Sequence, residues 1–249
     1  MEFLHSINPL YALSGLAIGA LVGFTGVGGG SLMTPVLVLL FGIHPATAVG
    51  TDLLYAGLSK ISGTAVHGLN GSVDWRITRR LAAGSAPAAA LTLLGLAYFG
   101  HDSKAASDVI TTTLGFALIV TAVTLIFRAW LLAKVASALE KLNDSQIRLL
   151  TNLLGAVLGV LVSISSVGAG AIGVTVLLML YPKLPTVKIV GSDIAHAVPL
   201  TLIAGTGHWF IGSIPGIAIG SQLASRVPDR VLRPILAGTL AIVGARLAI

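Results

Sequence analysis

The feature of this chain that most restricts its fold is a series of long segments that carry almost no charge. Most of them approach the roughly 20 residues that an α-helix needs to cross the hydrocarbon core of a bilayer. They lack the alternation of apolar and polar residues that the strands of a membrane β-barrel require. The sequence therefore predicts an all-α polytopic membrane protein. The segments are residues 45–69, 81–99, 110–127, 149–180, 188–210 and 231–249.

The composition agrees with this prediction and excludes several kinds of site. Charged residues make up 10% of the 249 residues, whereas a typical soluble domain has about 25%. The net charge of +6 is better explained by basic cytoplasmic loops than by binding of nucleic acid. The absence of cysteine excludes disulfides, thiolate metal sites and cysteine nucleophiles. We expect no cleavable signal peptide, no cofactor and no metal site.

The sequence repeats itself after about 140 residues. Four different features recur in the same order, which is a stronger signal than matching glycines in a chain that has 30 of them. We therefore predict two transmembrane repeats, residues 1–133 and 149–249, with a polar linker at 134–148. The matching features are GVGGG (26–30) with SVGAG (166–170), Phe41-Gly42 with Tyr181-Pro182 followed by Pro45 with Pro185, Gly50-Thr51-Asp52 with Gly191-Ser192-Asp193, and His67 with His208.

The positions of the basic residues indicate that the two repeats have opposite orientations. If residues 10–41 enter the membrane, turn at the glycines and return, twelve of the fifteen lysines and arginines fall on one face. If the same segment crosses the membrane instead, the basic loops divide almost evenly between the two faces. The positive-inside rule favours the first arrangement, with the basic loops and the linker in the cytoplasm. Each repeat would then open with a glycine-broken re-entrant helical hairpin, followed by about three spans.

The two glycine clusters are the main candidates for a substrate site. Inverted repeats with interrupted helices are typical of secondary transporters, whose site lies where the repeats meet. A helix that begins after each cluster would direct free N–H groups and a partial positive charge at an anion. The alternative, close helix packing, fits Gly15, Gly19 and Gly23 better than it fits consecutive glycines, which destabilise a helix. The candidate substrate-binding residues are Thr25, Gly28, Gly29, Gly30, Ser31, Ser165, Ser166, Gly168, Gly170 and Lys60.

Charged residues inside the apolar segments form a second group of candidates, because such residues are costly in a membrane. Asp52 and Asp193 are equally suited to proton transfer and, with Thr51 and Ser192, to capping a helix that restarts there. Lys60 would either offset the charge of an anion or form an internal ion pair. Histidines suit proton coupling, although an interfacial histidine bonded to backbone is an equal alternative for each one. The histidines considered for this role are His67, His196 and His208.

Four motifs spread over nearly the whole chain are specific as a set: GxxxGxxGVGGGxxxxPxL (19–37), HPATAVGTDL (44–53), GxVDWR (71–76) and RVPDRVLRPILAGTLAIVGARL (226–247). With these motifs the chain resembles the TauE/SafE family of sulfite exporters. The resemblance implies a multi-pass protein of the inner (cytoplasmic) membrane that exports small anions such as sulfite, organosulfonates or related sulfur oxyanions. One departure is a shortened second half, in which residues 214–225 would form an unusually short span.

We therefore expect a secondary transporter that works by alternating access and has no enzymatic activity. A passive anion channel is the main alternative, because it can use the same geometry. An intramembrane enzyme would need Ser59 or Ser62 paired with His67, and no nearby loop supplies an oxyanion hole. A cation transporter would use the two aspartates as ligands. The expected partners are a small anionic substrate and the lipid bilayer, without nucleic acid, and a homodimer is left open.

Overall fold

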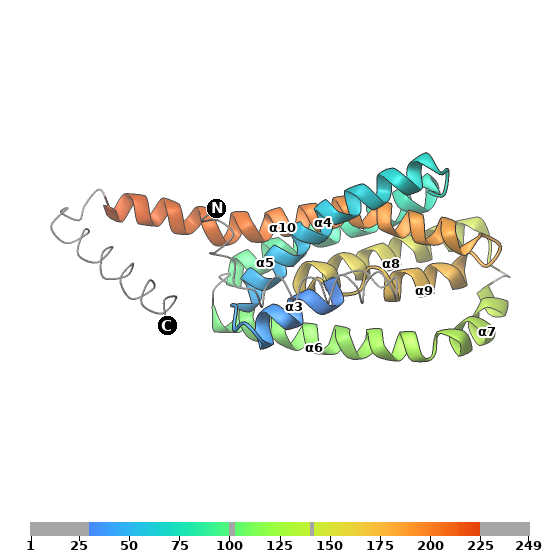
Figure 1. Ribbon diagram of the computed structural model, residues 1–249, viewed down its shortest axis with the longest axis horizontal. Helices are drawn as coiled ribbons and strands as arrows, with labels where there is room; N and C mark the ends of the chain where they lie inside the picture. The colour runs from blue at the N-terminus through green and yellow to red at the C-terminus, as the bar shows by residue number, and fades with distance from the viewer. Residues whose placement is uncertain (1–29, 100–102, 140–141, 225–249) are drawn as a thin grey trace, which may run out of the picture. The chain divides into compact units, whose positions relative to one another are not determined.

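The computed structural model describes residues 30–99, 103–139 and 142–224, which form eight α-helices and no strand (Figure 1). This arrangement confirms the all-helical prediction. The described residues up to Trp209 belong to one compact unit, and those from Phe210 to Ala224 belong to another. The helices are α3 (Gly30–Leu39), α4 (Pro45–Leu69), α5 (Trp75–Phe99), α6 (Lys104–Ile126), α7 (Arg128–Leu139), α8 (Asp144–Ser165), α9 (Ala171–Leu180) and α10 (Thr186–Ala224).

Four of the described helices are long and apolar enough to span a membrane: Trp75–Tyr98, Lys104–Ile126, Asp144–Ser165 and Thr186–Phe210. Large apolar side chains on α5 and α6 face outward, and Leu91 and Ile119 are 69% and 64% exposed. Such an exposed apolar surface is unusual for a soluble domain and is what contact with lipid requires. The protein is therefore a multi-pass membrane protein.

The segment predicted as a polar linker between the two repeats contains parts of two helices. Residues up to Leu139 belong to α7, and α8 already begins at Asp144. Asn143 and Gln146 form a capping box, in which each side chain accepts a hydrogen bond from the other residue's backbone N–H. Much of the segment predicted as a polar linker, residues 134–148, is therefore helical, because a polar composition indicates exposure to water and does not exclude helix.

The predicted short span at 214–225 is also absent as a separate helix. The backbone of α10 continues without a break from Thr186 to Ala224. The Gly-Ser-Ile-Pro sequence at 212–215 therefore does not begin a new helix, since a membrane helix tolerates glycine and proline. The last predicted segment, residues 231–249, lies outside the described residues.

The chain turns back on itself between α8 and α9. Ser166, Gly168 and Gly170 have φ angles of 60°, 123° and 101°, conformations that favour glycine and end a right-handed helix. After the turn, α9 returns along α8, and the Tyr181 hydroxyl lies 2.8 Å from Thr151 Oγ1. The helix break predicted at 166–170 is therefore present. Of the first glycine cluster only Gly30, the first residue of α3, lies within the described residues.

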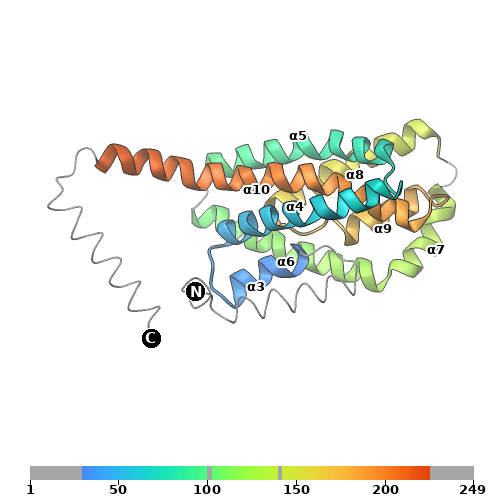
Figure 2. The same cartoon turned by 45° about the horizontal axis from the view of Figure 1, so that its top comes forward.

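Helices α5 and α8 approach each other at backbone distance. A Cβ at Gly84 would overlap the backbone of Asn152, and one at Gly155 would overlap the backbone of Leu81. Figure 2 shows the two helices beside each other. Because α5 belongs to the first predicted repeat and α8 to the second, the two halves are in close contact along these helices.

Helices α4 and α10 run side by side in opposite directions (Figures 1 and 2). Gly50 near the start of α4 packs against His208, and a Cβ there would lie 2.9 Å from the Cβ of His208. Gly191 near the start of α10 packs against His67, whose Nδ1 would lie 3.1 Å from such a Cβ. The same glycine–histidine contact therefore occurs twice, with the two halves exchanged.

Candidate functional site

Buried polar side chains from both halves meet at the break between α8 and α9. We call this group the central polar cluster. Among its members, Asp52, Thr34 and His196 are 0% exposed, and Asp193 is 2% exposed. The cluster consists of Thr34 from α3, Asp52 and Lys60 from α4, Ser85 from α5, Ser166 at the end of α8, and Asp193 and His196 from α10.

Asp52 connects α4 to α3 in the first half and to the helix break in the second half. The Thr34 hydroxyl of α3 donates a 2.6 Å hydrogen bond to Asp52 Oδ2. The Ser166 hydroxyl, at the helix break of the second half, also faces this carboxylate. Within the described part of the chain, neither Asp52 Oδ1 nor Ser166 Oγ has a hydrogen-bond partner of full geometry. The Asp52 carboxylate therefore has room for a further hydrogen bond or a proton beside the Ser166 hydroxyl.

The side chain of Asp193, a residue of α10, lies beside the first turn of α9. The backbone N–H of Gly170, the residue before this helix, faces the Asp193 carboxylate. A Cβ at Gly173 would lie 2.7 Å from Asp193 Oδ1, so the carboxylate rests on the first turn of α9. Its negative charge therefore stabilises the positive end of this helix.

This arrangement corrects the expectation that the two aspartates cap a restarted helix. Helices α4 and α10 run without a break through residues 50–52 and 191–193. The preceding glycines make room for a histidine of the opposite helix and do not interrupt their own helix. Asp193 caps α9, a different helix from its own.

The Lys60 side chain is half-buried, and its charge interacts with those of Asp193 and Asp52 and with the His196 ring. It makes no close ion pair with any residue that the structure describes. The alternative of a simple internal ion pair with Asp52 is therefore absent from this part of the chain. Its ammonium group adds a positive charge between two carboxylates.

The His196 ring is fixed from one side. Its Nε2 lies 2.8 Å from Ser85 Oγ of α5, and both residues are buried. Its Nδ1 has no partner among the described residues. Sequence analysis did not select Ser85 or Thr34. Ser85 could have been found because Gly84-Ser85-Ala86-Pro87 resembles Gly212-Ser213-Ile214-Pro215, whereas nothing in the sequence distinguishes Thr34.

His67 and His208 lie outside the cluster. His67 Nδ1 is 2.9 Å from Ser72 Oγ in the turn after α4, and His208 Nε2 donates to the Ser163 carbonyl at 2.7 Å. The His208 ring thus binds backbone, which is the structural alternative for this residue. The His67 ring binds a side-chain hydroxyl in the turn after its own helix.

The remaining predicted site residues are placed as follows. Ser192 accepts a 2.8 Å hydrogen bond from the Asp74 N–H and donates to the Lys188 carbonyl, so it fastens α10 to the turn before α5. Ser165 donates to the Leu161 carbonyl, and Thr51 is exposed. Gly30 and Ser31 belong to α3, and Gly168 and Gly170 to the helix break. Thr25, Gly28 and Gly29 lie outside the described residues.

The proposed nucleophile and base of an intramembrane enzyme are not brought together. Ser59 and Ser62 are exposed on α4, and His67 binds Ser72 instead. The structure thus offers no pairing of these residues for catalysis.

Comparison with known proteins identifies the family. The family model described as "Sulfite exporter TauE/SafE" matches residues 11–247. The probable membrane transporter protein YjnA of Bacillus subtilis (strain 168) is 36% identical over 249 residues, which cover 94% of this chain and 97% of that protein. The probable membrane transporter protein YdhB of the same organism is 25% identical over 244 residues, covering 91% and 94%. No solved structure matches the chain. The chain belongs to the TauE/SafE family of membrane transporters.

Proposed function

We propose that the protein is a secondary transporter that exports small anions, such as sulfite, organosulfonates or related sulfur oxyanions, by alternating access. The class of anion follows from the family name. One structural observation carries the mechanism, namely that the central polar cluster is buried where the two halves meet at a helix break. Non-helical backbone inside a membrane is tolerated only where it is buried in protein or lines a cavity. Substrate sites of secondary transporters are built at such places.

The unpartnered atoms of the cluster support a binding role. Leaving a buried polar group without a hydrogen bond costs about 1–3 kcal/mol. The cluster contains several such atoms within a short region of the protein, and a bound ligand or proton would satisfy them. The atoms without partners in the described residues are Asp52 Oδ1, Ser166 Oγ, Asp193 Oδ1 and His196 Nδ1.

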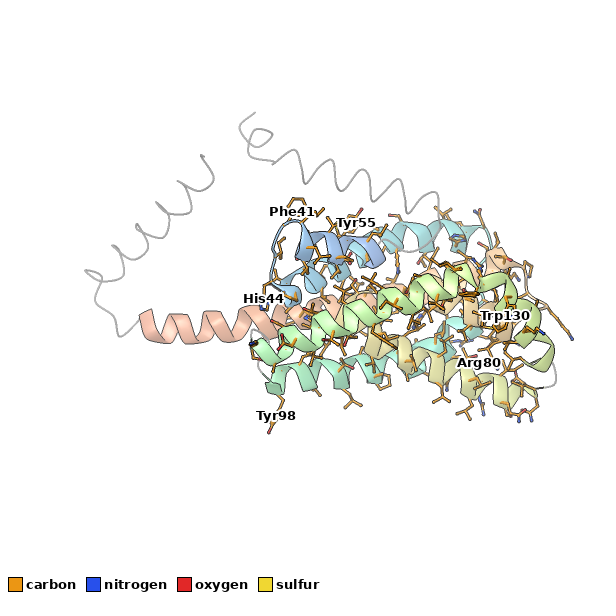
Figure 3. The ribbon with its side chains drawn as sticks, turned by 90° about the horizontal axis from the view of Figure 1, so that it is seen from below. Phe41, His44, Tyr55, Arg80, Tyr98 and Trp130 are labelled. Atoms are coloured by element: carbon orange, nitrogen blue, oxygen red, sulfur yellow. The ribbon has the colours of Figure 1, made fainter. Side chains whose placement is uncertain are left out.

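The directions of α3 and α9 support two inverted repeats. Helix α3 contacts Asp52 through Thr34, its fifth residue, and the first turn of α9 contacts Asp193. The end of α3 leads to His44, which lies 2.9 Å from Ser107 of α6, whereas α9 ends beside Arg80. Figure 3 shows His44 and Arg80 at opposite ends of this unit. The two short helices therefore run from the cluster to opposite ends.

Asp193 suggests how transport is coupled to protons. Its carboxylate already occupies the start of α9, which the sequence indicated as a position for the substrate anion. An anion that approaches this helix end meets either a charged carboxylate, which repels it, or a protonated one. Proton uptake by Asp193, and by Asp52 in the other half, would therefore be linked to anion binding.

A thermal-shift screen followed by a flux assay tests the proposed function. Purified protein is heated with sulfite, thiosulfate, sulfate, sulfoacetate or chloride, because a ligand that binds the folded state raises its melting temperature. We expect a sulfur oxyanion to give the largest shift and to show saturable flux in proteoliposomes. Absence of both effects for every anion would contradict the proposal, and single-channel currents would favour a passive channel instead.

A further inference from the structure

Within the central polar cluster, Asp52 and Asp193 alone occupy equivalent positions of the repeat. Asp52 aligns with Asp193 at an offset of 141 residues, whereas Lys60 aligns with Thr201 and His196 with Tyr55. The two aspartates therefore hold equivalent positions in the two halves. Lys60 and His196 add polar groups that occur only once, and they come from different halves.

One ring nitrogen of His196 has a hydrogen-bond partner, and the other has none among the described residues. Ser85 Oγ lies 2.8 Å from Nε2, and Ser85 itself is held in place because its backbone packs against Gly159 of α8. When the Ser85 hydroxyl donates to Nε2, the neutral ring carries its proton on Nδ1 and presents an N–H donor there. This donor is fully buried and has no partner in the described residues.

Lys60 lies on the part of α4 that packs against α10 around His196, because residues 57 and 63 of α4 contact residues 201–202 and 194 of α10. Its charge interacts with His196 and with the carboxylates of Asp52 and Asp193. It forms no ion pair with any residue that the structure describes. Its ammonium donors therefore have no close anionic partner among the described residues.

We propose that Lys60 and His196 together bind the oxyanion group of the substrate and that Ser85 is a positioning residue for His196. An ammonium and an imidazole N–H that approach from two helices suit an anion with at least two oxygens, such as sulfite or a sulfonate. A monatomic halide offers no separate oxygens to the two donors. This inference rests on the proposed function, because it names the groups that bind its substrate.

The decisive variants separate the donor at Nδ1 from the rest of the ring. His196→Leu removes both nitrogens, whereas His196→Asn places an amide N–H close to the position of Nδ1. Ser85→Ala removes the orienting hydroxyl, Ser85→Thr keeps it, and Lys60→Met removes the charge at similar length. Tyr55→Phe and Thr201→Val change the aligned positions of the other half and serve as matched controls.

The measurements are the melting-temperature shift caused by sodium sulfite and the KM and kcat of sulfite flux in proteoliposomes. We expect Lys60→Met and His196→Leu to raise KM about tenfold or more, which corresponds to the loss of one charge-assisted hydrogen bond. Ser85→Ala should raise KM with little change in kcat, and Ser85→Thr should restore it. In the His196→Asn background, Ser85→Ala should have no further effect, because no imidazole remains to be oriented.

Each outcome decides the inference. A wild-type KM for sulfite in Lys60→Met and His196→Leu, or equal effects of Ser85→Ala in both backgrounds, would overturn it while leaving transport itself intact. If the wild-type protein neither responds to nor transports any of the anions, the proposed function fails first. If a radical variant does not fold, Ser85→Thr and His196→Asn still decide, since both keep the predicted donor and should keep the sulfite-induced shift.

Discussion

The Asp193 carboxylate rests on Gly173, the third residue of α9, where a Cβ would lie 2.7 Å from its Oδ1. The corresponding aspartate, Asp52, accepts a hydrogen bond from Thr34 of α3. Each aspartate thus contacts the short helix of its own half. The two contacts differ in chemistry. Asp193 lies against the backbone of glycines 170 and 173, whereas Asp52 accepts a hydrogen bond from a threonine hydroxyl.

Gly173→Ala is predicted to impair transport without unfolding the protein. The new Cβ would displace the end of the Asp193 side chain from the first turn of α9. We expect the maximal flux in proteoliposomes to fall about tenfold or more, because a misplacement of about 1 Å at a functional site can cost about a hundredfold. Gly95→Ala in α5 is the matched control, since its Cβ would meet no atom within 4 Å. Equal flux in both variants would contradict the prediction.

Asp52→Asn and Asp193→Asn test the coupling to protons. Asparagine keeps the shape of the side chain but cannot release or take up a proton. We expect each variant to lose the dependence of sulfite flux on an imposed pH gradient, while exchange of labelled for unlabelled sulfite continues. The measurement is flux into proteoliposomes at equal and unequal pH on the two sides. If both variants respond to the gradient as the wild type does, proton coupling through these residues is wrong.

Gly84→Ala is predicted to destabilise the contact between α5 and α8. Its Cβ would overlap the backbone of Asn152, and backbone cannot move aside as a flexible side chain can. Overpacking of this kind typically costs about 1–3 kcal/mol. Thermal unfolding of the protein in detergent measures the change, and Gly95→Ala on the same helix should keep the wild-type melting temperature or raise it. A wild-type melting temperature for Gly84→Ala would show that the two helices can separate at little cost.

The sequence predicted those features in which the local backbone conformation or the membrane permits only a few residue types. The apolar length of residues 45–69 predicted the bounds of α4, and the glycines of 166–170 predicted the helix break. The offset of 141 residues identified Asp52 and Asp193 as an equivalent pair. In these cases a single local requirement leaves few alternatives.

The parts that sequence analysis missed depend on contacts between distant segments. Ser85 of α5 contacts His196 of α10, although the two residues lie 111 positions apart in the sequence. Asp193 caps α9 only because α10 passes the start of that helix. The sequence contains the residues for both contacts, but it does not state which helices lie side by side.

Labelling of single cysteines tests the orientation of the protein in the membrane. The chain has no cysteine, so each introduced thiol reports one position. Arg76 and Lys183 are exposed at the end of the unit where Arg80 contacts both Asp144 and Tyr181, and His44 is exposed at the other end. We expect a membrane-impermeant maleimide to label Arg76→Cys and Lys183→Cys only in inside-out vesicles, and His44→Cys only in intact cells, because basic loops remain in the cytoplasm. The unaltered chain is the control for background labelling. Labelling of positions 76 and 183 from opposite sides would mean that α8 and α9 do not form a re-entrant hairpin in the membrane.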